Sequence, residues 1–452
     1  MTLLFSVWLI LVLVLSFWNL KWGVASFLIY MVLVPYMKLQ IGGIELGQNL
    51  FNFAFLASYF YYANKHKVRT DWKPMLPFIV YFLATLCVMP LQDYVPFGVM
   101  LNSWRIDIMS SLFLPFVMWN VAKKEPDSVN IFRNVMLIAI TIAVGYGLFL
   151  TTTSGVNPYI MSLINLMDVN QDMESYYEAS NEGRLFGRIS SVYVHPMAYA
   201  LFLGLSFIYV FQCRNKIKKI FVILLLVAIG SSAITCGVRS VLGGLIVAVA
   251  YYFFMSKNYK MMIGVIAVAL VVFFIADSIP ELSRYLGSMA DVNNKKGDLS
   301  GSNIDMRLNQ LEGAIKEGSK DPLFGLGYGW TGYYKSLKGD HPICLAFESL
   351  IYVIICNFGL FGFVIWTYMV LKYMKINRKM HLRENVLFDC LMVFYVSYSC
   401  ITGEYGYMKH FLIFYVLMLC NQLRAKKKIP ASRVVVGNPA RKRVRRTGTL
   451  IH

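Results

Sequence analysis

Arginine residues stand beside apolar stretches in the middle of the sequence, where they could bind phosphate. Arg188 precedes one apolar run by a few residues, Arg239 opens another, and Arg307 lies in a polar segment between two later runs. A guanidinium group stays charged and can bind a phosphate through two parallel hydrogen bonds. Several of these groups converging on one cavity would suit a pyrophosphate. Each arginine alone could instead snorkel to a membrane interface or pair with a nearby carboxylate.

A histidine and a glutamate lie close together further along the chain. His341 is followed by Pro342, and proline is favoured in the first turn of a helix. We therefore expect His341 at the entrance of a helix, with Glu348 about two turns further on and on the same face. Histidine suits general-base catalysis, and the carboxylate could orient it or act as the base itself. The alternative is a histidine that caps the helix and a glutamate that pairs with a structural Arg or Lys.

Further polar residues lie near the ends of apolar runs and are weaker candidates. Those that could support a site are His195, Arg184 and Arg105, and those in the turn between the last two runs are Glu404, Lys409 and His410. The segment 322–329 carries glycine at alternate positions, which allows a tight turn or a close approach to a ligand. It lacks the Lys-Ser/Thr of a phosphate-binding loop, so a plain turn is the alternative.

The composition identifies the environment in which these residues act. Apolar residues make up 58% of the 452 residues, charged residues make up 15%, and the mean hydropathy is +0.56. Soluble domains are less apolar and more highly charged, so a soluble enzyme, a disordered protein and a nucleic-acid-binding protein with a simple basic surface are all excluded. Eight cysteines are scattered without a Cys-x-x-Cys pair, and no Asp-x-Asp motif is present, so we expect no metal site.

The apolar runs predict an all-α polytopic membrane protein with about 12–13 transmembrane helices. A span needs about 20 apolar residues, and the runs show no strand-like alternation. The first run follows no basic residue and precedes no Ala-x-Ala site, so we expect it to be retained rather than cleaved. The predicted spans are 3–20, 23–37, 45–62, 75–92, 104–121, 132–152, 192–212, 217–236, 238–256, 260–278, 343–371, 385–402 and 409–423.

Basic residues predict the orientation of these spans, because Lys and Arg concentrate in cytoplasmic loops. Clusters fall at 65–73, 123–124, 214–219, 257–260 and 372–383, which are alternate loops. The segments 153–190 and 279–340 then become two large extracytoplasmic loops, and a helical pattern is expected near 304–317. Residues 1–423 form a single bundle. Residues 424–452 form a cytoplasmic tail with ten basic residues and no acidic one, which suits anionic membrane lipid.

Several motifs between residues 184 and 371 resemble the bacterial O-antigen polymerase and ligase family. Arg188 followed by His195-Pro196 resembles the motif that opens a span in that family, and Thr235-Cys236-Gly237-Val238-Arg239 resembles its Thr/Ser-rich turn ending in Arg. Arg307, the glycine-rich segment 322–329 and His341 resemble its large outer loop in order and spacing. Gly359-Leu-Phe-Gly362 resembles the glycine pair of the following span.

The resemblance implies a fold and a reaction. The fold is that of a GT-C-like membrane glycosyltransferase in the bacterial cytoplasmic membrane. The implied activity is polymerisation of oligosaccharide repeat units carried on undecaprenyl pyrophosphate, without a metal or other cofactor and with a possible chain-length regulator protein as partner. Arg188, Arg239 and Arg307 would stabilise the pyrophosphate leaving group. His341 or Glu348 would accept the proton of the acceptor hydroxyl.

Two other functions remain open at the level of sequence. The same fold serves ligases that transfer a finished glycan to a lipid or protein acceptor. A transporter or flippase of lipid-linked sugars is the alternative from another class, and it predicts internal repeats, broken helices and charges at the membrane midplane. We see no such repeat in the sequence, and most candidate residues fall in the predicted outer segments.

Overall fold

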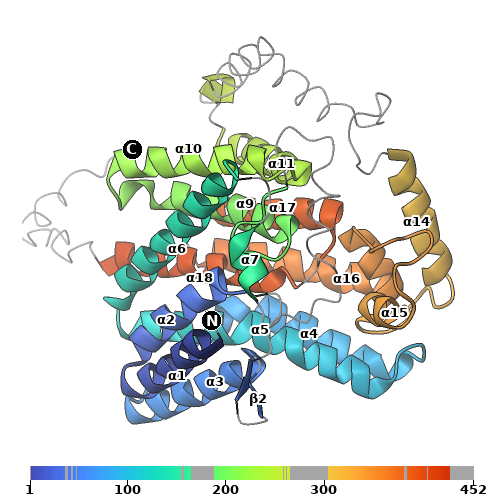
Figure 1. Cartoon of the computed structure of the whole chain (residues 1–452), viewed down its shortest axis with the longest axis horizontal. Helices are drawn as coiled ribbons and strands as arrows, with labels where there is room; N and C mark the ends of the chain where they lie inside the picture. The colour runs from blue at the N-terminus through green and yellow to red at the C-terminus, as the bar shows by residue number, and fades with distance from the viewer. Residues whose placement is uncertain are drawn as a thin grey trace, which may run out of the picture.

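A computed structural model of the chain describes residues 2–35, 39–41, 44–46, 48–153, 157–163, 188–257, 259–260, 262–264, 304–380, 384–404 and 406–427. These residues form a helical bundle with one small hairpin (Figure 1). The elements are α1 (Thr2–Trp18), α2 (Leu20–Leu33), β1 (Leu39–Ile41), β2 (Ile44–Leu46), α3 (Gln48–Lys65), η1 (Lys73–Met75), α4 (Leu76–Val88), η2 (Met89–Leu91), α5 (Phe97–Lys124), α6 (Ser128–Leu150), α7 (Pro158–Leu163), α9 (Pro196–Gln212), η4 (Cys213–Asn215), α10 (Lys219–Thr235), α11 (Arg239–Ser256), α14 (Ile304–Gly318), α15 (Trp330–Lys338), α16 (Leu350–Lys379), α17 (Asn385–Thr402) and α18 (Met408–Lys427).

The described residues include six helices that are long and apolar enough to cross a membrane. They are Lys73–Leu91, Ser128–Leu150, Pro196–Asn215, Arg239–Ser256, Leu350–Lys379 and Asn385–Thr402. Large apolar side chains such as Leu224 on α10 and Val364 on α16 are more than half exposed, which suits contact with lipid rather than water. The chain is therefore a helical polytopic membrane protein. The antiparallel pair β1 and β2 is its only strand pairing among the described residues, and the sequence did not predict it.

Most predicted spans overlap helices, with several bounds shifted; α5, for example, begins at Phe97 instead of at residue 104. The predicted span 343–371 begins only at Leu350, because residues 341–349 form a turn instead of a helix. The last helix runs to Lys427, four residues beyond its predicted end. The predicted span 260–278 lies outside the described residues except for its first few, and the tail 428–452 lies wholly outside them. The helix expected near 304–317 is confirmed as α14.

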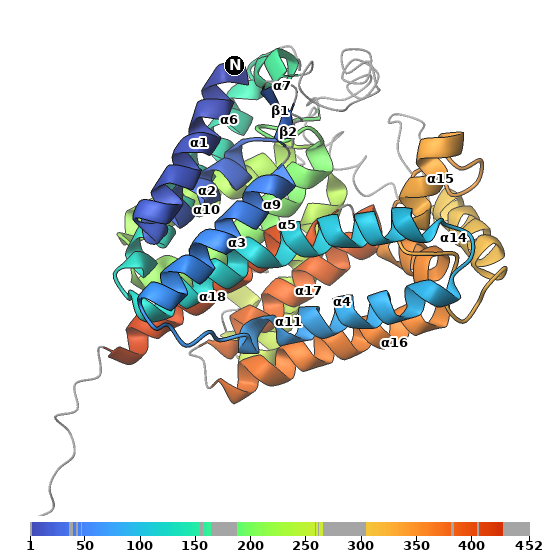
Figure 2. The ribbon, with the colours of Figure 1, turned by 90° about the horizontal axis from the view of Figure 1, so that it is seen from below.

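Loops that carry the basic clusters meet at one end of the bundle, which we call the basic end. Lys123 at the end of α5 pairs with Asp71 of the α3–α4 loop at 2.6 Å. Arg214 after α9 pairs with Glu384 before α17, also at 2.6 Å. Figure 2 shows the ends of α3 and α18 on this side, whereas α14 and α15 lie at the opposite end. Loops that alternate along the sequence and carry the basic clusters therefore lie on the same side of the bundle.

The end opposite the basic end, which we call the cavity end, has a core of its own. Its buried side chains come from segments far apart in the sequence, including Met100 on α5, Trp330 on α15 and Phe358 on α16. The larger core runs through the helices from α1 to α18. The second core is what fixes α14 and α15 against the end of the bundle.

Helix α16 is interrupted at Gly359, where the segment 322–329 docks onto it. Gly359 has φ 56° and ψ −146°, a backbone conformation that essentially only glycine adopts. The break leaves backbone N–H groups of α16 without their helical acceptors. Carbonyl groups of the docked segment accept hydrogen bonds from them instead. Leu360 donates to the carbonyl of Pro322 at 2.9 Å, and Phe361 donates to that of Leu323 at 3.0 Å. The interruption is thus compensated by hydrogen bonds to another part of the chain.

The glycines of segment 322–329 allow this docking. A β-carbon on Gly325 would overlap the backbone of Phe358 and Asn357 on α16. The buried amide of Gln92, after η2, joins the same contact by donating to the carbonyls of Phe324 and Asn357 and accepting from the N–H of Tyr328. The close backbone approach expected from the alternating glycines is therefore made to the chain itself.

Candidate functional site

Two adjoining cavities open at the cavity end of the bundle. The first, of about 400 Å³, is lined by polar side chains and by apolar residues such as Met31 of α2 and Met197 of α9; the polar ones are Tyr193, His195, Lys335, Glu348, Tyr407, Lys409 and His410. The second, of about 570 Å³, has a different set of polar residues, including Ser103, Asp107 and Glu404. Lys335 and Ala346 line both cavities. The two spaces are therefore neighbours, with Lys335 at their boundary.

His195 lies at the entrance of α9 and lines the first cavity. Its Nδ1 accepts a hydrogen bond from the N–H of Met197, so the imidazole caps the helix, and Pro196 fills the first helical position. Burial, together with the positive charges of Arg188 and Lys335, lowers the pKa of His195 to about 4. The side chain is therefore neutral at physiological pH. Because Nδ1 is an acceptor, Nε2 carries the proton and is a donor.

Lys409 and His410 reach the first cavity from the beginning of α18. His410 is buried and its ring packs edge-on against that of Tyr193, with the ring centroids 5.8 Å apart. Lys409 is half-buried and forms no hydrogen bond or ion pair with a described residue. Lys335 comes from α15, is about half exposed and pairs at 3.2 Å with Asp340. The first cavity thus holds two ammonium groups next to apolar wall residues such as Met31 and Val34.

Asp107 is the carboxylate of the second cavity that accepts a side-chain hydrogen bond through only one of its oxygens, as far as the described residues are concerned. Its Oδ2 accepts a hydrogen bond of 2.8 Å from the hydroxyl of Tyr328. Burial raises the pKa of Tyr328, and the nearby charge of Asp107 raises it further, so the phenol stays protonated as a donor. By contrast, the carboxylate of Glu404 accepts from the Tyr395 hydroxyl and from two backbone N–H groups at the start of α18. Glu404 is therefore committed to capping that helix.

The boundary between the cavities is a turn that replaces the expected start of a helix. His341 and Leu345 exchange backbone hydrogen bonds of 3.1 and 2.9 Å, and helix α16 begins only after Ser349, which caps it. Leu345 and Phe347 have φ of 50° and 54°, in the left-handed region that non-glycine residues rarely adopt. Such strained positions persist only where surrounding packing imposes them, and they concentrate at functional sites. They flank Ala346, which lines both cavities.

This turn corrects the predicted relation between His341 and Glu348. They are not on one helical face, because neither lies in a helix. The Nδ1 of His341 accepts from the N–H groups of Ile343 and Cys344, and its Nε2 lies 3.8 Å from the carboxylate of Glu317 on α14. His341 is 5% exposed. Burial lowers its pKa, although Glu317 opposes this effect.

Two aromatic rings pack against the imidazole of His341. Tyr334 lies 5.0 Å and Phe347 5.5 Å from its ring, measured between centroids, and Phe347 lines the second cavity. His341 therefore supports the cavity wall from behind, and its imidazole is absent from the lining residues of the two cavities. Its catalytic role stays a prediction.

Glu348 pairs with Arg307 rather than with His341. The Nη2 of Arg307 lies 3.1 Å from Oε2 of Glu348, and Nη1 donates to the backbone carbonyl of the same residue at 2.7 Å. Both side chains are about a quarter exposed. The structural ion pair that the sequence left open as an alternative is therefore formed. Glu348 lines the first cavity, whereas its partner Arg307 is not among the lining residues.

The remaining predicted residues are distributed more widely. Arg188 lies near enough to His195 for its charge to act on the imidazole. Arg239 is the first residue of α11, is partly exposed and forms no ion pair with a described residue. Arg105 is exposed and bonds to Asn102 of its own helix. Arg184 lies outside the described residues. The cations that line the first cavity are thus lysines instead of the predicted arginines.

Asp107 and Lys335 are site residues that the sequence reasoning missed. Asp107 follows the start of α5 by ten residues, about 15 Å along the helix axis. Asp107 also falls in the predicted span 104–121, and an ionisable residue inside a predicted membrane span is a functional candidate by default, so this signal was present in the sequence. Lys335 had no such signal, because it lies in a polar segment whose position depends on tertiary packing.

Comparisons with known proteins do not identify a family. No protein-family model matches the chain, and a search of curated proteins finds no significant match. In the part of the chain that the structure describes, no group of three or more His, Cys, Asp or Glu side chains could hold a metal ion. The resemblance to O-antigen polymerases and ligases stays a prediction.

Proposed function

We propose that the protein is a membrane glycosyltransferase that transfers a saccharide from a polyprenyl pyrophosphate carrier to a hydroxyl group of a second lipid-linked repeat unit. The observation that carries this proposal is the pair of adjoining cavities, one with two ammonium groups and an apolar wall, the other with the carboxylate of Asp107. A glycosyl transfer of this kind needs an anion-binding pocket for the leaving group and a base for the acceptor, side by side.

The first cavity suits the pyrophosphate of the donor. Lys335 and Lys409 supply positive charge, and the polar side chain of His195 lines the same cavity. Met31 and Val34 at the end of α2 form an apolar wall beside them, along which a polyprenyl chain would leave the cavity for the lipid. As the glycosidic bond breaks, negative charge grows on the leaving oxygen, and the two ammonium groups stabilise it.

The second cavity suits the acceptor. The acceptor oxygen forms a bond to the anomeric carbon while the bond from that carbon to the pyrophosphate oxygen breaks. The bonding pair leaves with the pyrophosphate, and the hydroxyl proton passes to the carboxylate of Asp107. Tyr328 fixes this carboxylate through its hydrogen bond to Oδ2, and in this proposal Oδ1 accepts the proton. Asp107 thus takes the role that the resemblance assigned to His341 or Glu348.

The orientation of the bundle agrees with this reaction. The basic end belongs on the cytoplasmic side, because Lys and Arg concentrate there in membrane proteins. The cavities then open on the outer face of a bacterial cytoplasmic membrane, where lipid-linked oligosaccharides are elongated into surface polysaccharide. A ligase would use the same donor pocket with a different acceptor in the second cavity.

The proposal is tested by variants compared in a strain whose own copy of the gene is deleted. Asp107→Asn removes the base and retains the hydrogen bond from Tyr328, and Asp93→Asn changes an exposed aspartate outside the cavities. Lys335→Ala removes a cation of the first cavity, and Lys338→Ala removes one that faces the ring of Tyr334. The readouts are the length distribution of the surface glycan and the amount of protein in the membrane.

We expect Asp107→Asn to lower transfer by roughly 100- to 10,000-fold, the usual contribution of a general base, with normal membrane insertion. Single repeat units should then accumulate on the carrier at the outer face, and Lys335→Ala should show a weaker form of the same defect. Both control variants should make normal polymer. Normal polymer from Asp107→Asn refutes the assignment of the base. Substrate that stays on the inner leaflet in these variants refutes glycosyl transfer in favour of a flippase.

A further inference from the structure

A third cavity lies at the basic end, away from the two cavities of the proposed site. It has a volume of about 680 Å³ and lies between the α3–α4 loop and the end of α5. Five of its lining residues are cationic and one is acidic; they are Lys67, Arg69, Lys73, Lys123, Lys124 and Asp71. The formal charge of the lining is therefore +4.

The single carboxylate of this cavity, that of Asp71, already has partners in the protein. Asp71 accepts a hydrogen bond of 2.6 Å from Lys123, one of 3.1 Å from the N–H of Lys73 and one of 3.3 Å from Trp119. The four other cations form no ion pair with a described carboxylate. Glu125, which directly follows Lys124 in the sequence, pairs with Lys21 and accepts a hydrogen bond from the Tyr62 hydroxyl. The four cations therefore repel one another, and an external anion that binds among them would reduce this repulsion.

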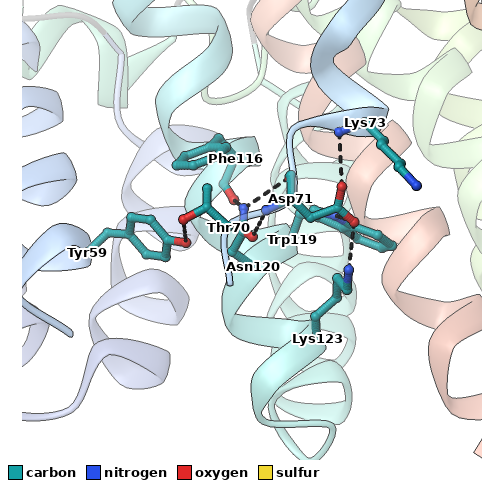
Figure 3. A network of polar contacts seen from close by, with 8 residues as sticks. All are labelled: Tyr59, Thr70, Asp71, Lys73, Phe116, Trp119, Asn120 and Lys123. Atoms are coloured by element: carbon teal, nitrogen blue, oxygen red, sulfur yellow. Dashed lines mark hydrogen bonds and ion pairs between the residues drawn. The ribbon is translucent and has the colours of Figure 1, made fainter. Parts of the chain in front are cut away.

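The loop that carries these cations is held in place by contacts to neighbouring helices. The amide oxygen of Asn120 on α5 accepts from the N–H of Asp71 at 2.7 Å, and its amide nitrogen also bonds to the Asp71 carbonyl (Figure 3). The Thr70 hydroxyl bonds to Tyr59 on α3 at 3.3 Å, as the same view shows. A binding site whose backbone is already ordered loses less entropy when a ligand binds.

The rim of the cavity is apolar where it meets the helices. Trp72 stacks on Phe116 with a centroid distance of 3.8 Å and an interplanar angle of 19°, yet remains 45% exposed. Leu76, at the start of α4, is 40% exposed beside it. Tryptophan is enriched at membrane interfaces, where its ring is at headgroup level. A soluble phosphate would need only the cations, whereas a lipid uses both the cations and this rim.

We propose that this cavity binds the headgroup of an anionic phospholipid of the cytoplasmic leaflet. Its phosphate lies among Arg69, Lys73 and Lys124, and its acyl chains pass Trp72 and Leu76 into the bilayer. Basic pockets at the cytoplasmic ends of helices are known to recognise such headgroups. The site does not depend on the proposed glycosyl transfer, because it uses none of the same residues and lies at the opposite end of the bundle.

The experiment uses the full chain in phosphatidylcholine nanodiscs that contain increasing amounts of phosphatidylglycerol brominated on its acyl chains. Bromine quenches nearby tryptophan, so Trp72 reports a lipid bound at the rim. The first variant, Arg69→Gln/Lys73→Gln/Lys124→Gln, removes three cations of the cavity. Its matched control, Lys218→Gln/Lys219→Gln/Lys260→Gln, removes three exposed cations outside the cavity. Trp72→Phe identifies the part of the quenching that comes from the rim.

We expect the cavity variant to lower the apparent affinity for phosphatidylglycerol by roughly 100-fold or more, since each charge-assisted hydrogen bond that the cavity makes directly to the phosphate contributes about tenfold. The control variant should lose far less, and Trp72→Phe should abolish the saturable quenching while thermal unfolding of all variants stays unchanged. Equal losses in the two triple variants would overturn the proposal, since the attraction would then be diffuse. Displacement of the lipid by millimolar inorganic phosphate would also overturn it, by identifying a soluble ligand.

Discussion

Replacing Gly359 with alanine tests whether the docking of segment 322–329 holds α16 in its interrupted form. The β-carbon of alanine would lie 2.6 Å from the carbonyl oxygen of Pro322 and 2.9 Å from the N of Gly325. Both contacts are with backbone atoms, which a rotation of a side chain cannot relieve. The φ of 56° is also strained for any residue with a β-carbon.

The destabilisation has two parts. A non-glycine residue in this region of φ and ψ costs about 1–3 kcal/mol. Forcing an added methyl group into a packed contact costs typically 1–3 kcal/mol more. The sum, roughly 2–6 kcal/mol, is comparable to the whole stability of many proteins. We therefore expect Gly359→Ala either to unfold the cavity end at ordinary temperature or to lower its unfolding midpoint by many degrees.

The matched control is Gly145→Ala in α6, where a β-carbon would meet no atom within 4 Å. Alanine at that helical position should change stability by less than about 1 kcal/mol, in the stabilising direction. Thermal unfolding in detergent gives the midpoints, and hydrogen exchange of residues 322–329 locates the effect. Midpoints within a degree of each other, with unchanged exchange in that segment, would refute the role assigned to Gly359.

Two further predictions concern single polar residues. His195→Ala should destabilise the protein by about 1 kcal/mol, because α9 loses its cap. His195→Asn can accept the same hydrogen bond from Met197 and should recover most of the loss in unfolding midpoint. An equal loss in both variants would contradict the capping role. Burial alone would raise the pKa of Asp71, but the hydrogen bonds from Lys123, the Lys73 N–H and Trp119 outweigh it and lower the pKa below the usual 3.8. A carboxyl group whose pKa is lowered on folding adds stability that is present above its unfolded pKa and is lost as the pH falls through the folded value. The stability difference between the native protein and Asp71→Asn should therefore shrink as the pH falls below about 4, and a difference that is constant with pH would contradict the ion pair.

The positions of the helices could be predicted from the sequence because the bilayer leaves few choices. An apolar run of about 20 residues in lipid must satisfy its backbone within itself, which makes it a helix. The lysines and arginines between runs then identify which loops share a side. The pairing of Lys123 with Asp71 and of Arg214 with Glu384 at one end agrees with that alternation.

The turn at 341–349 could not be predicted, because it depends on partners distant in the sequence. Pro342 and the apolar residues after it favour a helix locally. Hydrogen bonds between His341 and Leu345, with Glu317 and Arg307 of α14 packed alongside, stabilise a turn instead. This tertiary packing outweighs a local preference of a few tenths of a kcal/mol per residue.

The sequence by itself determined that this chain is a helical membrane protein and which loops lie together, since those properties follow from the solvent around each segment. It also contained Asp107, a charge inside an apolar run. Only the tertiary structure decided that this carboxylate faces a cavity next to Lys335, that Arg307 holds Glu348, and that His341 lies behind the wall. The physical reason is that contacts between side chains depend on how helices pack and where α16 breaks, and a linear pattern does not encode either one locally.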